Sequence, residues 1–210
     1  MKNIAIYSLA IVALGVGLFF TSDRLAAYPQ PARLAVSWQL DVTYERPHAI
    51  AVRGLDGRIR WYFYFAYKIV NQSKREQFFV PDVTLATDQG DIITANRGIP
   101  PRVFAAIKKR LGNRLLEDPS QVSGQVLIGE DHARQSVAIW RAFDHDVDRM
   151  TVFFAGLSGE IKTIKRPGTD KDVTLRKTLM LSYHTPGTPA AGITPQFQSF
   201  RLDKERWVMR

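Results

Sequence analysis

The segment 61–70, Trp-Tyr-Phe-Tyr-Phe-Ala-Tyr-Lys-Ile-Val, restricts the fold of this chain more than any other. In a β-strand successive side chains point to opposite faces. One face would then carry Trp61, Phe63, Phe65, Tyr67 and Ile69. The other would carry Tyr62, Tyr64, Ala66, Lys68 and Val70, and a tyrosine can bury its ring while its hydroxyl stays in water. The pattern predicts a central strand with one core face and one partly covered face.

A second interpretation of the aromatic segment is a platform on which nucleic-acid bases stack. Proteins that bind single strands combine exposed aromatic rings with basic groups. Tyr62 and Tyr64 would be the outward rings here, with Arg60 and Lys68 nearby. Two tyrosines on a sheet are common in proteins of every function, so the structural interpretation is favoured.

The remainder of the chain from residue 34 onward also reads as short strands separated by turn signals. Asp56-Gly57 is typical of a hairpin turn. Further extended segments are predicted at 34–42, 48–52, 78–86, 122–128, 136–140, 151–155, 161–165, 173–183 and 197–202. Many short strands with frequent turns indicate an all-β sandwich.

One segment breaks this pattern, and it predicts a helix over residues 101–111. Pro101 suits the first helical position, and Gly112 suits the residue just past the end. Three bases, Lys108, Lys109 and Arg110, would lie in the last turn, where the helix dipole favours cations. The same bases could instead contact acidic lipid headgroups.

The N-terminal segment 4–20 is apolar apart from a tyrosine and a serine and carries no charge. A helix of that length spans roughly 25 Å, which indicates a secretory signal or a signal anchor. The apolar run is long, and no Ala-x-Ala triplet occurs between residues 21 and 35, so an uncleaved anchor is favoured. We therefore expect a transmembrane helix at 1–21, a proline-containing spacer at 22–33 and a sandwich domain at 34–210. The basic residues do not decide the orientation; because long domains translocate largely regardless of charge, the N-terminus is expected inside and the domain outside.

Composition excludes several kinds of chemistry. The chain has no cysteine, which rules out thiolate metal sites, disulfides and a cysteine nucleophile. Its formal net charge is +9, and such an excess favours anionic partners such as phosphate-rich membranes or nucleic acid. The charge by itself does not choose between these partners.

Catalytic motifs are scarce in the sequence. The four histidines form no metal-binding helical pair. The turn Asp144-His145-Asp146 could supply ligands to a divalent ion, and His132 could join them. The alternative is a solvated acidic turn between two strands. The segment 156–160 approaches Gly-x-Ser-x-Gly, but the second glycine comes one position early. No cofactor is expected.

Three segments resemble bacterial immunoglobulin-like domains that follow signal peptides or lipoprotein anchors. They are 67–71 (Tyr-Lys-Ile-Val-Asn), Gly129-Glu130 with 137–140 (Val-Ala-Ile-Trp), and 152–156 (Val-Phe-Phe-Ala-Gly). The whole chain also resembles a family of membrane-anchored proteins from planctomycete-type bacteria. These resemblances imply an immunoglobulin-like antiparallel β-sandwich outside the inner membrane, with the helix at 101–111 as an insertion, and they imply no catalytic activity.

The functional expectation is a membrane-tethered, periplasmic binding or scaffolding module of the cell envelope. Its partners would be the inner membrane, through the N-terminal helix, and a protein or other envelope component; no nucleic acid is expected. The candidate interaction surface comprises Tyr62, Tyr64, Arg102, Lys108, Lys109 and Arg110. Two alternatives stay open: a metal-assisted hydrolase that uses Asp144, His145 and Asp146, and a nucleic-acid-binding module.

Overall fold

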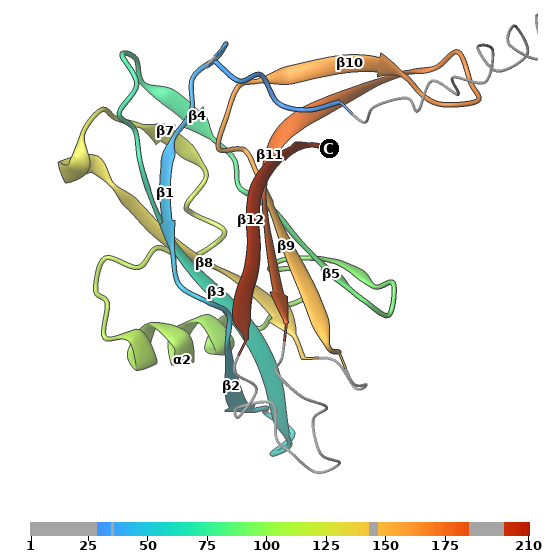
Figure 1. The fold of residues 1–210 in the computed structure, drawn as a ribbon. Helices are drawn as coiled ribbons and strands as arrows, with labels where there is room; N and C mark the ends of the chain where they lie inside the picture. Colours follow the sequence, from blue (N-terminus) through green and yellow to red (C-terminus); the bar gives the residue numbers. More distant parts are fainter. Residues whose placement is uncertain (1–28, 35, 143–146, 185–199) are drawn as a thin grey trace, which may run out of the picture.

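A computed structural model describes residues 29–34, 36–142, 147–184 and 200–210 of the chain (Figure 1). The membrane helix predicted at 1–21 and most of the predicted spacer lie outside these residues. Within the described ranges, no helix has the length and apolar character needed to cross a membrane.

The first sheet is built around β3 (Ile59–Val70), the strand predicted from the aromatic segment. β1 (Asp41–Tyr44) and β2 (His48–Arg53) pair with its two halves, and between them the backbone N–H of Glu45 donates to the carbonyl of Ala66. β8 (Arg134–Arg141) pairs with β3 from Tyr62 to Ile69. All of these pairings are antiparallel, and β3 is central as predicted.

The second sheet has the order β12 (Arg201–Met209), β11 (Asp172–His184), β9 (Arg149–Ala155), β5 (Asp82–Thr87) and β6 (Ile92–Thr94). β10 (Ile161–Lys165) pairs with the first part of β11. A separate ribbon joins β4 (Gln77–Phe79) to β7 (Gly124–Val126). Within the described residues, the helices are α2 (Pro101–Leu111) and the short 3-10 helix η1 (Glu130–His132).

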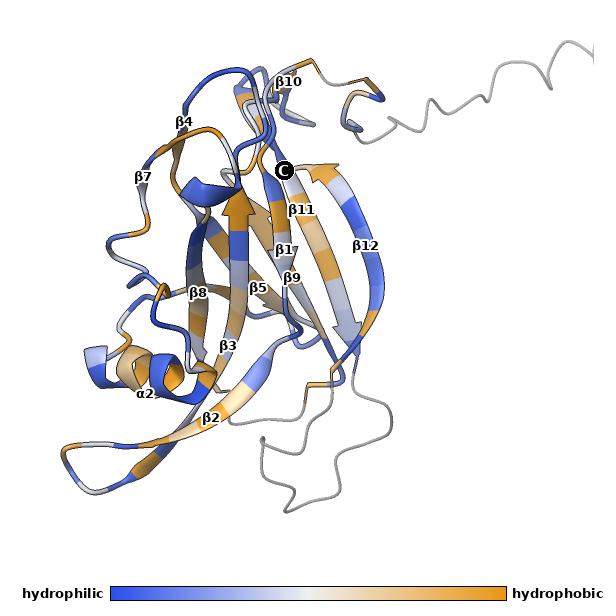
Figure 2. Cartoon of the chain, turned by 90° about the vertical axis from the view of Figure 1, so that its left-hand side faces the viewer, coloured by the Kyte–Doolittle hydropathy of each residue, from blue (hydrophilic) through white to orange (hydrophobic). Residues whose placement is uncertain are grey.

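The two sheets pack face to face and enclose the main hydrophobic core. Phe65 and Trp140 of the first sheet and Phe154 of the second are each 1% exposed or less, and the rings of Tyr67 and Phe154 lie 4.7 Å apart. Figure 2 shows apolar residues recurring along β3, β8 and β11. The alternation of β3 thus places its apolar face between the sheets. The chain is mainly β, in line with the predicted sandwich.

The opposite face of the first sheet is covered by α2. Val103 and Ile107 of the helix are fully buried against Tyr64, Ile139 and the residues beside them. The sequence predicted that this face would be partly covered, whereas α2 buries most of it. Tyr62 and Tyr64 are 5% and 1% exposed, so they do not offer stacking surfaces to a ligand. An amphipathic helix needs an apolar partner, and this face of the sheet is the one it uses.

The local signals for the helix and the hairpin are confirmed. α2 begins at Pro101 and ends before Gly112, whose φ of 62° closes the helix in the left-handed conformation. The hairpin between β2 and β3 turns at Asp56-Gly57, where the glycine has a φ of 75°.

Three strand predictions needed correction. The strand expected at 34–42 is limited to β1, preceded by one bridge between Gln39 and Ser158. The strand expected at 78–86 is divided at Pro81, which has no backbone N–H to donate to a ladder. The strand expected at 197–202 is instead β12, which runs to Met209 because it pairs with β11 along its length.

An arginine-lined candidate binding site

A pocket of about 490 Å³ lies on the helix-covered face of the first sheet, just beyond the start of α2. The strand register explains its floor: Val52 pairs with Arg60, and Tyr62 pairs with Arg141, so all four share one face. The turn 53–56 and the segment 97–102 also line it. Three parts of the chain that are distant in sequence thus surround one hollow.

The charge of the pocket is dominated by guanidinium groups. Five arginines line it, and they face a single carboxylate, that of Asp56. The arginines are Arg53, Arg60, Arg97, Arg102 and Arg141. Such a concentration of fixed positive charge in a concave site attracts anions.

Two of the five arginines are held by the hairpin itself. Arg60 forms two hydrogen bonds with the carboxylate of Asp56, one of them 2.9 Å long, and Arg53 donates to the carbonyl of Gly57 at 3.1 Å. The hydrogen bonds from Arg60 lower the pKa of Asp56 to about 2. At neutral pH this carboxylate is therefore ionised and satisfies one guanidinium.

The guanidinium groups of the other three arginines, Arg97, Arg102 and Arg141, form no hydrogen bond or ion pair with any residue that the structure describes. Arg102 lies in the first turn of α2, which has no acidic residue and no side-chain cap. The positive end of the helix dipole thus adds to the guanidinium charge. The pocket combines unpaired cations with an uncompensated helix start.

A backbone feature holds Arg97 at the pocket. The preceding residue, Asn96, adopts a left-handed φ of 63°, which is uncommon outside glycine. Its backbone N–H donates to the carbonyl of Ile139, and its side-chain oxygen accepts from the N–H of Ile139. The segment that carries Arg97 is thereby fastened to the edge of β8.

The predicted interaction surface does not form one surface. Lys108 donates to the carbonyl of Leu116 at 2.7 Å, and Arg110 donates to that of Ala49 at 2.8 Å. Lys109 is exposed on the helix. Of the six predicted residues, Arg102 and Tyr62 line the pocket, and Tyr62 does so as part of its floor. Tyr64 lies under the helix.

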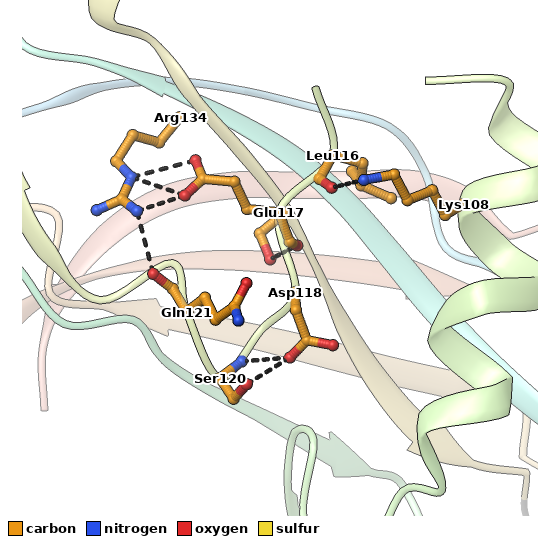
Figure 3. Close-up of polar contacts among 8 residues, drawn as sticks. Lys108, Leu116, Glu117, Asp118, Ser120, Gln121 and Arg134 are labelled. Carbon is orange, nitrogen blue, oxygen red and sulfur yellow. Dashed lines mark hydrogen bonds and ion pairs between the residues drawn. The ribbon is translucent and has the colours of Figure 1, made fainter. Parts of the chain in front are cut away.

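A second polar cluster fastens the loop after α2 to β8 (Figure 3). Arg134 makes hydrogen bonds with both carboxylate oxygens of Glu117, and it also donates to the carbonyl of Gln121 at 3.1 Å. The hydroxyl of Ser136 donates to the carbonyl of Glu117 at 3.0 Å. The charges in this cluster are paired with one another, which gives it a structural role.

The predicted metal-binding turn, Asp144-His145-Asp146, lies outside the described residues. His132 is exposed in η1. Among the residues whose positions are described, no group of three or more histidine and carboxylate side chains could hold a metal ion.

Sequence reasoning missed the pocket because its arginines are scattered over residues 53–141. One signal was present: Arg53, Arg58 and Arg60 crowd a single hairpin, and Arg60 shares a strand face with Tyr62. The segment 97–102 could not be joined to this hairpin without the tertiary structure.

The pocket is suited to binding an anion. Its apolar lining comes from Val52, Leu55, Ile99 and Pro100, while the guanidinium groups can each present paired donors to a phosphate or a carboxylate. Among the described residues that line it, the one carboxylate is engaged by Arg60, and no histidine or lysine is present.

No protein-family model matches this sequence, and neither a curated protein nor a solved structure does so. The resemblance to immunoglobulin-like envelope proteins consequently stays a prediction.

Proposed function

We propose that this chain is a non-catalytic binding module of the cell envelope that captures an anionic group of its partner in the arginine-lined pocket. The observation that carries the proposal is the convergence of five arginines on one pocket with a single carboxylate among them. Cations held beside one another without an anion repel each other, so a ligand that carries negative charge relieves their repulsion. The arginines thus favour a negatively charged group, and the apolar walls contact the part of the ligand that carries this group.

The proposal keeps the N-terminal segment 4–20 as a tether in the inner membrane, with the sandwich in the periplasm. The position of the pocket is compatible with a partner in the envelope rather than with the lipids of the tethering membrane. Asp41, near the point where the chain enters the sheet, pairs with Val70, whereas the pocket hairpin pairs at Ile59. The twelve-residue strand β3 separates these ends by roughly 35 Å.

The proposal also assigns the sandwich to the immunoglobulin-like class. Two of the segments that carry the resemblance lie in opposing sheets, on β8 and β9. Trp140 at the end of the first segment is buried between those sheets, 1% exposed. This arrangement supports the class, and an experimental structure compared strand by strand with such domains would test it.

The pocket is tested by isothermal titration calorimetry, in which the full chain in detergent is titrated with inorganic pyrophosphate and, separately, with citrate. Two variants, Arg97→Gln and Arg102→Gln, each remove one unpaired guanidinium. We expect binding of at least one probe and a loss of about tenfold in affinity for each variant, since a hydrogen bond to a charged group contributes about 1.5–3 kcal/mol.

Arg58→Gln and Arg114→Gln provide matched controls. Both arginines are exposed, and neither lines the pocket, although Arg58 belongs to the same hairpin. Retained affinity in these controls would assign the effect to the pocket rather than to net charge. Equal losses in all four variants, or no binding of either anion, would contradict the proposal.

A further inference from the structure

The ribbon formed by β4 and β7 has one buried face and one exposed apolar face. Phe79 and Val126 point inward and are 0% and 1% exposed. On the outside, Phe78 is 68% exposed, Val80 52% and Leu127 40%. A phenylalanine that is two-thirds exposed beside other exposed aliphatic side chains forms a patch of a kind that commonly marks an interaction site.

This ribbon lies at the end of the sandwich at which the chain enters from its N-terminal segment. Asn71, at the end of β3, donates its side-chain amide to the carbonyl of Val126. Gly156 approaches Val80 closely, and the next residue, Leu157, accepts a hydrogen bond from Leu40. Figure 1 shows β4, β7, β10 and the first described residues at the end opposite the β2–β3 hairpin.

Further exposed apolar residues belong to the same end. Leu34 is 82% exposed, Val36 68% and Ile161 62%. Two exposed bases, Lys74 and Arg75, lie in the turn just before β4, followed by Glu76, whose carboxylate accepts a hydrogen bond from Gln125. Apolar side chains bordered by bases are the composition expected of a surface that touches an anionic bilayer.

The incoming chain is fastened to this end of the domain. The backbone N–H of Ala32 donates to Glu160 at 2.7 Å, and Glu160 forms a buried ion pair with Lys177 at 3.3 Å. The N–H of Gly159 donates to the carbonyl of Trp38. The domain is thus attached from Ala32 onward.

The short distance in sequence between this attachment and the apolar segment restricts where the domain can be. Residue 20 ends the apolar run, so the connection to Ala32 spans at most about 40 Å even when fully extended. A connection of that length keeps the attached end of the domain within about 40 Å of the bilayer.

We infer that the outer face of the β4–β7 ribbon, together with Leu34 and Val36, lies against the surface of the membrane that holds the tether. The inference rests on the membrane tether of the proposed function, but not on the pocket. It makes the sandwich stand upright on the bilayer, with the arginine-lined pocket directed away from it. The exposed apolar side chains of the ribbon would then contact lipid instead of water.

The absence of cysteine from the chain makes a site-directed probe straightforward. Phe78→Cys is labelled with an environment-sensitive fluorophore in the full chain, reconstituted into vesicles of phosphatidylethanolamine and phosphatidylglycerol. Ile92→Cys is the matched control, because Ile92 is 69% exposed and lies on β6, away from the ribbon. We expect the probe at residue 78 to shift to shorter wavelength and to be quenched by brominated lipids, while the probe at residue 92 remains in a water-like environment.

Flotation of the vesicles separates failure of the tether from failure of this inference. Protein that floats with the vesicles while residue 78 stays water-like would overturn the inference and leave the pocket untouched. Disulfide-linked dimers of unlabelled Phe78→Cys in detergent would indicate that a second copy of the chain covers the ribbon. Together with a labelled variant that brominated lipids do not quench in vesicles, they would also overturn the inference. Protein that does not float would remove the tether and the inference together, whereas anion titration would still report on the pocket.

Discussion

Asn96 and Ile139 exchange two hydrogen bonds: the backbone N–H of Asn96 donates to the carbonyl of Ile139 at 2.8 Å, and the Asn96 side-chain oxygen accepts from the N–H of Ile139 at 2.9 Å. Asn96 therefore satisfies the free edge of β8 at the point where the chain turns into the pocket wall. Among the described residues other than glycine, it is the one with a positive φ.

Replacement of Asn96 by alanine is expected to lower the free energy of unfolding by about 2 kcal/mol. The substitution removes one acceptor and leaves the N–H of Ile139 without it, and it adds the cost of a left-handed alanine. Asn96→Gly avoids the backbone cost but still loses the hydrogen bond, so its free energy of unfolding should lie between those of the parent and of Asn96→Ala. Urea unfolding monitored by circular dichroism measures these differences, and an alanine variant as stable as the parent would contradict the assigned role.

Asp56→Asn is expected to strengthen anion binding in the pocket. The carboxylate of Asp56 now occupies Arg60 and repels an incoming anion. Its neutral isostere would leave Arg60 available, and we expect the affinity for pyrophosphate to rise about threefold to tenfold. Calorimetric titration at neutral pH checks this; a lower affinity would mean that Asp56 acts mainly by orienting Arg60.

The pair of Glu160 and Lys177 gives a prediction about the attachment of the incoming chain. Their side chains are 8% and 11% exposed, so removing one partner strands the other in a buried position. We expect Glu160→Ala to cost about 3 kcal/mol, and the double variant Glu160→Gln/Lys177→Met to cost less than Glu160→Ala alone. Chemical denaturation of the single and double variants tests this, and additive losses would show that the two residues act independently.

Two glycines allow the stability cost of a left-handed backbone to be distinguished from the cost of a steric clash. Gly156 and Gly57 both have positive φ, 90° and 75°. A Cβ at residue 156 would lie 2.1 Å from the carbonyl oxygen of Val80, whereas a Cβ at residue 57 would meet no atom within 4 Å. Gly57→Ala should cost about 1 kcal/mol, and Gly156→Ala should cost several times more. Equal unfolding midpoints for the two variants would contradict this explanation.

Three tyrosines with raised pKa values predict a loss of stability at high pH. Burial raises the pKa of Tyr67 and Tyr183 well above its ordinary value, and burial together with a hydrogen bond to Glu205 raises that of Tyr44. Above about pH 10 these groups ionise in the unfolded chain but remain protonated in the folded one, so the unfolded state binds fewer protons and stability falls with rising pH. Below that pH their contribution is fully present.

Denaturant unfolding at about pH 9 and about pH 11, with tyrosinate absorbance recorded in parallel, measures this effect. The tyrosinate absorbance of Tyr44, Tyr67 and Tyr183 is expected to appear together with unfolding. Ionisation of all tyrosines near pH 10 in a chain that keeps its native circular dichroism would contradict it.

Local patterns in the sequence were sufficient for the individual elements. The alternation of residues 61–70 identified the central strand, and Pro101 and Gly112 marked the ends of the helix, because these signals act through residues that are neighbours in the chain. The strand at 161–165 was also predicted with its observed bounds. Where a non-local partner decided the outcome, as for β12 along β11, the prediction was wrong in its extent.

The sequence by itself determined which residues of β3 share a face, but it left open what covers each face. Only the tertiary structure showed that α2 buries Tyr62 and Tyr64, and that the arginines of one hairpin meet Arg97, Arg102 and Arg141. The physical reason is that alternation and helix capping depend on local geometry, whereas a pocket depends on which distant segments pack together to bury apolar surface. The binding site is consequently a property of the packing.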